Sequence, residues 1–266
     1  MIRTGVTGAT GRMGRIVIQR VMAASGFELV AAFERKDSPG IGVPLGDSSS
    51  LRGGNRIRIE SMREDSLRGL DVLIDFTAPQ ATLEHVEKAE KAKVAMVIGT
   101  TGVEEKGERS IKKASSRIPI VMAPNMSVGA NLLFELTRLA GSTLLKYDAE
   151  IVEAHHRMKK DAPSGTARRL AQEIARARGW DTSSFVYGRK GTADSRRERE
   201  IGIHALRAGD IVGRHNVIFS GPGETVELVH QALSREAFAE GAIRAARFIV
   251  KKKRGLYDMR DVLAKK

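Results

Sequence analysis

The hydrophobic pattern of the first part of the chain alternates between short apolar runs and one amphipathic stretch. A β-prone run at residues 2–7 leads into a glycine-rich segment. Apolar residues then recur on one helical face from Met13 to Ala24. A second apolar run at 27–33 ends at Glu34. This order predicts a strand, a loop, a helix and a second strand that ends at an acidic residue.

The same alternation continues to about residue 126. Strands and intervening helices are expected, in chain order, at 71–76, 82–93, 94–98, 104–116 and 119–122. Strands that alternate with helices predict an α/β fold with a Rossmann-type, doubly wound parallel sheet. Ligands bind such sheets at the carboxyl ends of the strands.

After residue 126 the pattern changes to that of a second, α+β domain. The expected features are a helix at 131–146, a strand at 149–154, an irregular polar stretch at 181–201 and an antiparallel hairpin at 216–232. Ser234 is expected to cap a last helix whose apolar face extends to Ile249.

Composition excludes several classes of protein. The chain has 266 residues and no cysteine, which excludes disulfide scaffolds, thiolate nucleophiles and metal sites built on sulfur. Hydrophobic residues make up 41%, too many for a disordered chain, and no apolar run is long enough to span a membrane. We therefore expect a cytoplasmic protein with no membrane association and no metal site.

The net charge of +13 leaves the kind of partner open at first. It could serve nucleic acid, acidic metabolites or solubility alone. A nucleic-acid-binding regulator finds no support, because no helix-turn-helix or zinc finger is readable and aromatic residues make up only 5%. We expect no nucleic-acid partner.

Three glycines follow the first predicted strand, in the spacing G-x-x-G-x-x-G at Gly8, Gly11 and Gly14. Gly8 permits a tight turn, Gly11 lets a pyrophosphate approach the backbone, and Gly14 lets the helix pack closely on the sheet. The helix N-terminus offers N–H groups to phosphates. Glu34 is placed to accept hydrogen bonds from a ribose. A glycine triplet alone is typical of many loops, but this context predicts a dinucleotide site.

Arg35 and Lys36 follow the acidic residue directly. A carboxylate repels the 2′-phosphate of NADPH, whereas a neighbouring guanidinium can pair with it. The tract therefore predicts the use of both NADH and NADPH. The alternative is that both cations are ordinary loop charges.

The tract E-A-H-H-R-M-K-K-D-A-P-S-G-T-A at 153–167 holds two adjacent histidines with a lysine close behind. An apolar helical face follows, so residues 163–166 are expected to open a helix whose N–H groups form an anion site. This combination points to a carboxylate substrate that receives a proton, since an imine or carbonyl that accepts a hydride must be protonated. A solvated loop would also account for a histidine pair at a strand end.

Five motifs together resemble the bacterial dihydrodipicolinate (4-hydroxy-tetrahydrodipicolinate) reductase family. They are the tract at 153–167, V-T-G-A-T-G-R-M-G-R at 6–15, G-T-T-G at 99–102, P-N-M-S-V-G at 124–129 and R-A-G-D-I-V-G at 207–213. The resemblance implies NAD(P)H-dependent reduction of 4-hydroxy-tetrahydrodipicolinate to tetrahydrodipicolinate, in lysine and diaminopimelate biosynthesis. It also implies a homotetramer that assembles through the sheets of the second domain.

The resemblance implies a division of the chain and roles for particular residues. Residues 1–129 and 235–266 would bind the dinucleotide, and residues 130–234 would bind the dicarboxylate substrate and form the oligomer. His155 would be the general acid/base and Lys159 the proton donor. The substrate carboxylates would be held by His156, Lys160, Ser164, Gly165 and Thr166. The cofactor would be bound by Gly8, Ala9, Thr10, Gly11, Arg12, Met13, Glu34, Arg35, Gly99, Thr100, Thr101, Ala123, Pro124, Asn125 and Met126.

Two positions depart from the family pattern. Thr225 stands where an arginine often follows Gly-Glu, and Met158 stands where a third histidine can occur. Neither departure is expected to abolish activity, and both bear on the detailed substrate contacts. A dehydrogenase of the same architecture that acts on another amino-acid-derived dicarboxylate is the alternative function.

Overall fold

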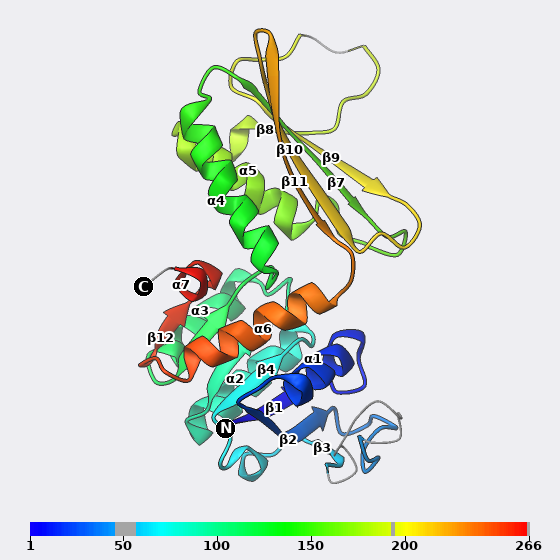
Figure 1. The fold of residues 1–266 in the computed structure, drawn as a ribbon, viewed down its shortest axis with the longest axis vertical. Helices are drawn as coiled ribbons and strands as arrows, with labels where there is room; N and C mark the ends of the chain where they lie inside the picture. The colour runs from blue at the N-terminus through cyan, green and yellow to red at the C-terminus, as the bar shows by residue number, and fades with distance from the viewer. Residues whose placement is uncertain (46–56, 193–194, 265–266) are drawn as a thin grey trace. The chain divides into compact units, whose positions relative to one another are not determined.

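The computed structural model describes residues 1–45, 57–192 and 195–264, and the chain divides into two compact units. Unit 1 comprises Met1–Ser127 and Arg235–Lys266, and unit 2 comprises Val128–Ser234. Each unit is built around a sheet of its own (Figure 1). No helix in the described part of the chain is both long and apolar enough to cross a membrane.

The described residues of unit 1 form a seven-stranded sheet in the order β12-β6-β5-β4-β1-β2-β3, and every pairing is parallel. The Rossmann-type prediction is thereby confirmed. The strands are β1 (Ile2–Thr7), β2 (Phe27–Glu34), β3 (Ile59–Ser61), β4 (Val72–Asp75), β5 (Ala95–Ile98), β6 (Pro119–Met122) and β12 (Gly255–Tyr257).

Helices cover both faces of this sheet (Figure 1). One core layer packs α1 (Arg12–Ala23), α6 (Glu236–Ile249) and α7 (Met259–Leu263) against it. The other packs α2 (Pro79–Ala92) and α3 (Glu105–Ser115), together with the short 3-10 helix η2 (Asp65–Leu67). Strands covered on both sides are largely apolar, and in β5 all four residues are apolar and buried.

Unit 2 contains a five-stranded mixed sheet in the order β11-β10-β7-β9-β8. Its strands are β7 (Asp148–His155), β8 (Phe185–Tyr187), β9 (Ile201–Arg207), β10 (Gly213–Gly221) and β11 (Glu224–Ala232). The helices α4 (Val128–Thr143) and α5 (Gly165–Arg178) pack on one face, and the 3-10 helix η3 (Thr182–Ser184) precedes β8.

The two faces of the unit 2 sheet differ because side chains alternate along each strand. Ala149, Ile151 and Phe219 point into the core beneath the helices. The opposite face, here called the open sheet face, carries Val152, Leu206, Ile218 and Val229, which are partly or largely exposed.

Several sequence predictions of elements need correction. The stretch 181–201 was expected to be irregular but contains η3 and β8, and β9 and β12 were not predicted. These strands are short or interrupted by glycine, so their pairing depends on partners distant in sequence. The cap position of α6 falls on Arg235, one residue after Ser234.

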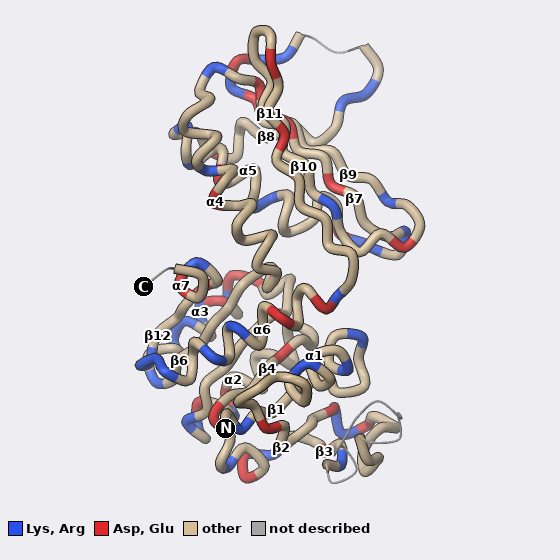
Figure 2. The backbone as a smooth tube through the Cα atoms, in the orientation of Figure 1, with Lys and Arg blue, Asp and Glu red and all other residues tan. Residues whose placement is uncertain are grey.

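Acidic and basic residues are interspersed over both units (Figure 2). The basic run at 251–254 lies in the turn between α6 and β12, just beyond the C-terminal end of the helix. A helix C-terminus favours positive charge there, and Lys252 Nζ also lies 4.5 Å from the centre of the Phe248 ring.

Candidate functional site

The glycine-rich loop between β1 and α1 has the geometry of a phosphate cradle. Gly8 has a φ of +64°, and its carbonyl oxygen accepts a hydrogen bond of 2.9 Å from the Gly11 amide. A Cβ at Gly14 would lie only 1.9 Å from the Gly8 carbonyl oxygen, so only glycine permits this approach of helix and loop. Helix α1 begins at Arg12 with no capping side chain and no acidic residue in its first turn. Its N-terminus is therefore suited to an anion.

Glu34 ends β2 beside this loop, as the sequence predicted. Its Oε1 accepts hydrogen bonds from the Thr10 amide at 2.9 Å and from the Thr10 hydroxyl at 2.6 Å. The Arg35 guanidinium points to Asp37 across 3.3 Å, and both side chains are largely exposed. The carboxylate is thus fixed, whereas the neighbouring cation is held only weakly.

The remaining predicted cofactor residues follow β5 and β6 at the same edge of the sheet. The Gly99 amide donates to the Asp75 carbonyl at 2.8 Å, and the Ala123 amide donates to the Ile98 carbonyl at 3.3 Å. Thr101 and Pro124 are exposed there, and the Ser127 amide donates to Asn125 Oδ1. Ala123 and Met126 are buried in the core of unit 1, so their side chains do not line a surface.

A buried carboxylate that the sequence reasoning missed organises this edge. Asp75 is fully buried, and its Oδ2 lies 2.6 Å from His85 Nδ1. Its Oδ1 accepts from the hydroxyls of Thr77 and Thr100 at 2.7 and 3.1 Å. Burial acts to raise the pKa of Asp75, but the hydrogen bonds from His85 and Thr77 outweigh it and lower the pKa below its usual value. Asp75 therefore anchors the Gly99–Thr100 turn to β4.

In unit 2, the histidine tract follows the end of β7. His155 is the last residue of the strand and is 9% exposed, on the face that α5 covers. Lys159 lies in the following loop, where its Nζ donates to both oxygens of Asp161 at 2.7 and 2.9 Å. His156 is partly exposed, and Lys160 is exposed.

The N-terminus of α5 comes next to His155. Ser164 caps the helix, and its Oγ accepts from the Ala167 amide at 3.2 Å. Gly165 and Thr166 form the first turn, with Thr166 buried. The Nε2 atom of His215, in β10, lies 3.1 Å from Ser164 Oγ. The His215 ring packs edge-on against the His155 ring, with 5.1 Å between the ring centres. Burial, helped by His155, lowers the pKa of His215 to about 3, so this ring is neutral at ordinary pH.

Glu153, two residues before His155 on the same face of β7, holds this arrangement together. Its Oε2 lies 2.5 Å from His155 Nδ1, and Arg207 from β9 pairs with the same carboxylate at 2.8 Å. Burial acts to raise the pKa of Glu153, but the hydrogen bonds from His155, Arg207 and the Ser164 amide lower it to about 2. The E-x-H spacing was the available sequence signal for this residue, whereas Arg207 and His215 are far along the chain.

Thr225 does not lie near this constellation within unit 2. It pairs with Ser220, which pairs with Asp148 at the start of β7, whereas His155 ends that strand. The departure from the family pattern at Thr225 therefore removes no charge from beside His155. Met158 is 75% exposed in the loop after β7.

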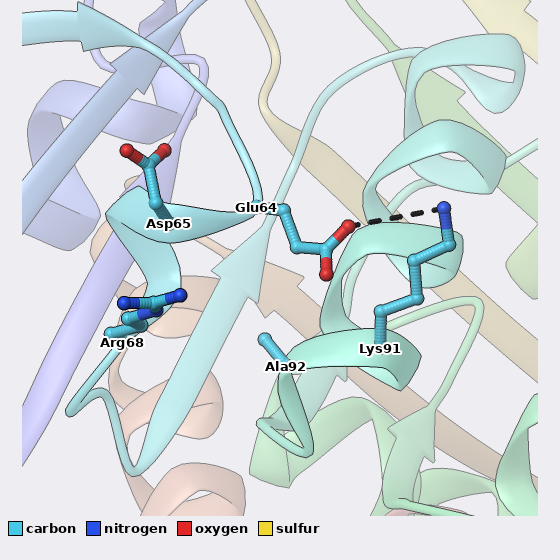
Figure 3. A pocket seen from close by; sticks show the side chains of 5 residues that line it. All are labelled: Glu64, Asp65, Arg68, Lys91 and Ala92. Carbon is cyan, nitrogen blue, oxygen red and sulfur yellow. Dashed lines mark ion pairs between the residues drawn. The ribbon is translucent and has the colours of Figure 1, made fainter.

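An open surface pocket lies elsewhere in unit 1 (Figure 3). It is lined by Glu64, Asp65, Arg68, Lys91 and Ala92. These residues precede β4 and β5, so the pocket lies at the amino ends of the strands. Ligands of doubly wound sheets bind at the opposite edge, and the Glu64–Lys91 pair in this pocket, at 3.9 Å, is solvent-exposed. We assign it no function.

Comparison with known proteins covers both units. Residues 2–126 match the family model described as dihydrodipicolinate reductase, N-terminus, and residues 129–263 match the model for the C-terminus. The chain belongs to the dihydrodipicolinate reductase family. The resemblance inferred from the motifs is confirmed.

Individual family members agree over the full length. A 4-hydroxy-tetrahydrodipicolinate reductase from Thiobacillus denitrificans is 46% identical over 100% of this chain and 99% of its own. One from Dechloromonas aromatica is 48% identical over 98% and 97%. Among solved structures, the dipicolinate-bound dihydrodipicolinate reductase from Paenisporosarcina sp. TG-14 is 27% identical, with a TM-score of 0.76 over 99% of this chain and 100% of that one.

Proposed function

We propose that this protein reduces 4-hydroxy-tetrahydrodipicolinate to tetrahydrodipicolinate and water with NADH or NADPH, in lysine and diaminopimelate biosynthesis. The main observation is that the buried Glu153 carboxylate contacts both His155 and the Ser164 amide at the α5 N-terminus. Relatives that match the chain over its full length are named for this activity.

The residues of unit 1 fit a dinucleotide. The loop at 8–14 packs so closely on the start of α1 that Gly14 leaves no room for a Cβ, and Glu34 is already fixed beside it. Gly8, Ala9, Thr10, Gly11, Arg12 and Met13 would hold the pyrophosphate, and Glu34 and Arg35 the adenosine ribose. The turns at 99–101 and 123–126 would hold the nicotinamide half. Bound NADH or NADPH supplies the hydride.

Unit 2 would hold the dicarboxylate and manage its protons. The first turn of α5, which follows the cap residue Ser164, offers the backbone N–H groups of Gly165 and Thr166 to one carboxylate. His156 and Lys160 add hydrogen bonds and positive charge. Lys159 would donate the proton that the reduced substrate needs, and His155 would act as general acid/base at Nε2. The dipicolinate-bound relative supports a pyridine dicarboxylate as a probe of this site.

We also propose a homotetramer that forms through the open sheet face. Its apolar side chains Val152, Leu206, Ile218 and Val229 stand on a face that neither α4 nor α5 covers. Sheet faces of this kind associate by burying apolar side chains.

The test of the function uses purified protein and enzymatically generated substrate. Oxidation of NADPH should depend on that substrate, and His155→Ala and Lys159→Ala should each lower kcat about 10²-fold or more because a proton-transfer group is lost. NADPH binding, followed by fluorescence, should persist in both. Lys146→Ala, at an exposed lysine before β7, is the control. Full activity in both site variants would refute the catalytic roles, and turnover of a different imine or semialdehyde would favour the alternative dehydrogenase.

A further inference from the structure

The Glu153 carboxylate is saturated with hydrogen-bond donors. Its side chain is fully buried. Oε1 accepts from the Ser164 amide at 2.9 Å and from Arg207 Nη2 at 2.8 Å. Oε2 faces His155 Nδ1 at 2.5 Å and accepts from Arg207 Nη1 at 2.9 Å. Each oxygen thus meets two nitrogens, and three of the four contacts come from groups that are always donors.

Arg207 is the first residue of the motif R-A-G-D-I-V-G, and the proposed reaction assigns no role to this motif. The segment lies against the histidine tract along its length. Arg207 Nη2 also donates to the Asp161 carbonyl at 2.6 Å. The Ala208 amide donates to the His155 carbonyl at 2.9 Å, and the Arg157 amide donates to the Gly209 carbonyl at 3.1 Å. At the end of the motif, a Cβ on Gly213 would lie 3.1 Å from His155 Nε2.

We infer that Glu153, held in place by Arg207, is a positioning residue that keeps the proton of the neutral His155 ring on Nδ1 and leaves Nε2 for the substrate. The other ring nitrogen of a functional histidine is set by the hydrogen bond that it makes. Through the Ser164 amide, the same carboxylate fixes the ring relative to the α5 N-terminus. The inference rests on the proposed role of His155.

Only a carboxylate can satisfy this arrangement. In Glu153→Gln, one oxygen becomes an NH2 group, which is a donor. The amide oxygen should remain toward the Ser164 amide, because that backbone donor cannot change. The NH2 group then faces His155 Nδ1. The ring can accept from it only by moving its proton to Nε2, which is the wrong tautomer for a base at that atom.

Other charged and titratable groups surround the ring. His215 packs against it from β10, and His230 from β11 is close enough to His215 to influence its pKa, as is Lys159. Lys159 is itself paired with Asp161. In the described part of unit 2, the hydrogen-bond partner of His155 Nδ1 is the Glu153 carboxylate, which accepts from it, so the tautomer of this ring depends on Glu153.

The test is the tautomer of His155 in the full-length protein. Histidine is labelled with ¹⁵N, the His155 resonances are assigned by their loss in His155→Gln, and spectra are recorded at alkaline pH. The wild type should show the Nδ1–H tautomer and Glu153→Gln the Nε2–H tautomer. Glu173→Gln is the matched control, because Glu173 is also buried in unit 2 and pairs with Arg169 at 2.7 Å. It should leave the tautomer unchanged.

Kinetics give the second readout. Glu153→Gln should lower kcat about 10²-fold, since a wrong tautomer disables a base while the ring remains present. The KM for NADPH should stay within about twofold, and Glu173→Gln should retain wild-type kcat. A wild type with the Nε2–H tautomer would overturn the inference even if Glu153→Gln did not fold. An unchanged tautomer in a folded Glu153→Gln protein would also overturn it. If the wild type turned over no dicarboxylate but the tautomer switched, the proposed function would fail and the positioning role would stand.

Discussion

Glu34 and Thr10 form a pair that bears on the choice of cofactor. Thr10 contributes both its amide and its hydroxyl to Glu34 Oε1, while the Arg35 amide lies 3.2 Å from Oε2. The carboxylate is therefore held in place for the proposed contact with a ribose, and a side chain that is already fixed loses less entropy on binding. To pair with a 2′-phosphate, the Arg35 guanidinium has to break only its exposed ion pair with Asp37.

Thr10→Val should shift the preference from NADH toward NADPH. Valine keeps the backbone N–H but removes the hydroxyl, so the Glu34 carboxylate loses one charge-assisted hydrogen bond and some of its fixed position. We expect NADH affinity to fall about 3–10-fold and NADPH affinity to change less. Titrations of cofactor fluorescence measure both. Thr10→Ser keeps the hydroxyl and serves as control, and an equal loss for both cofactors in Thr10→Val would contradict the assignment.

Glu153 also connects secondary-structure elements. Through its partners it joins β7 to β9 and to the first turn of α5. Its pKa of about 2 lies well below the ordinary 4.5, so the ionised form stabilises the folded state. The stabilisation is complete above about pH 4.5 and is lost as the pH falls toward 2. Its size is about 3 kcal/mol by linkage.

The acid stability of unit 2 should therefore depend on Glu153. Trp180, the single tryptophan of the chain, packs against the core of unit 2 and reports its unfolding. In urea unfolding followed by Trp180 fluorescence, Glu153→Gln should be less stable than the wild type at pH 7. The difference in unfolding free energy between the two proteins should narrow by about 3 kcal/mol between pH 5 and pH 2. The reason is that residue 153 is an ionisable carboxylate in the wild type only. Parallel pH profiles of the two proteins would contradict this.

The molecule as a whole consists of two units with separate cores, and they are suited to different tasks. Helices cover both faces of the unit 1 sheet, so both faces are buried in the core of that unit. In the described part of unit 2, helices cover one face of the sheet, and the open sheet face is the surface proposed for association. Of the net charge of +13, unit 1 carries +10 and unit 2 carries +3. Acidic and basic residues are interspersed over both units (Figure 2), so the charge does not single out a macromolecular partner.

Val229→Asp should convert the proposed tetramer to smaller species. Val229 is 49% exposed in β11, so the charge costs little in the isolated chain. In an assembly it would be buried without a partner. Sedimentation velocity measures the change. Leu145→Asp, at a residue 58% exposed in the turn between α4 and β7, is the control and should leave the assembly intact. A tetrameric Val229→Asp protein would place the interface elsewhere.

The arrangement around His155 was only partly predictable from the sequence. The strand period of two places Glu153 on the same face as His155, and the pattern at 163–175 indicates that a helix follows. The sequence contains no local signal that Arg207 and His215 meet these residues. They arrive on β9 and β10, and β9 was not predicted because Gly202 and flanking polar residues obscure its alternation.

The sequence alone determined the Rossmann-type alternation of strands and helices in unit 1, the glycine cradle with Glu34, and the family. These depend on short-range spacing, since helix and strand periods and glycine positions act within a few residues. The tertiary structure decided which donors surround Glu153, how Asp75 anchors the Gly99–Thr100 turn, and which face of the unit 2 sheet stays open. Each of these depends on strands paired across many residues, because hydrogen bonds to a buried carboxylate form only where the packed fold brings the donors together.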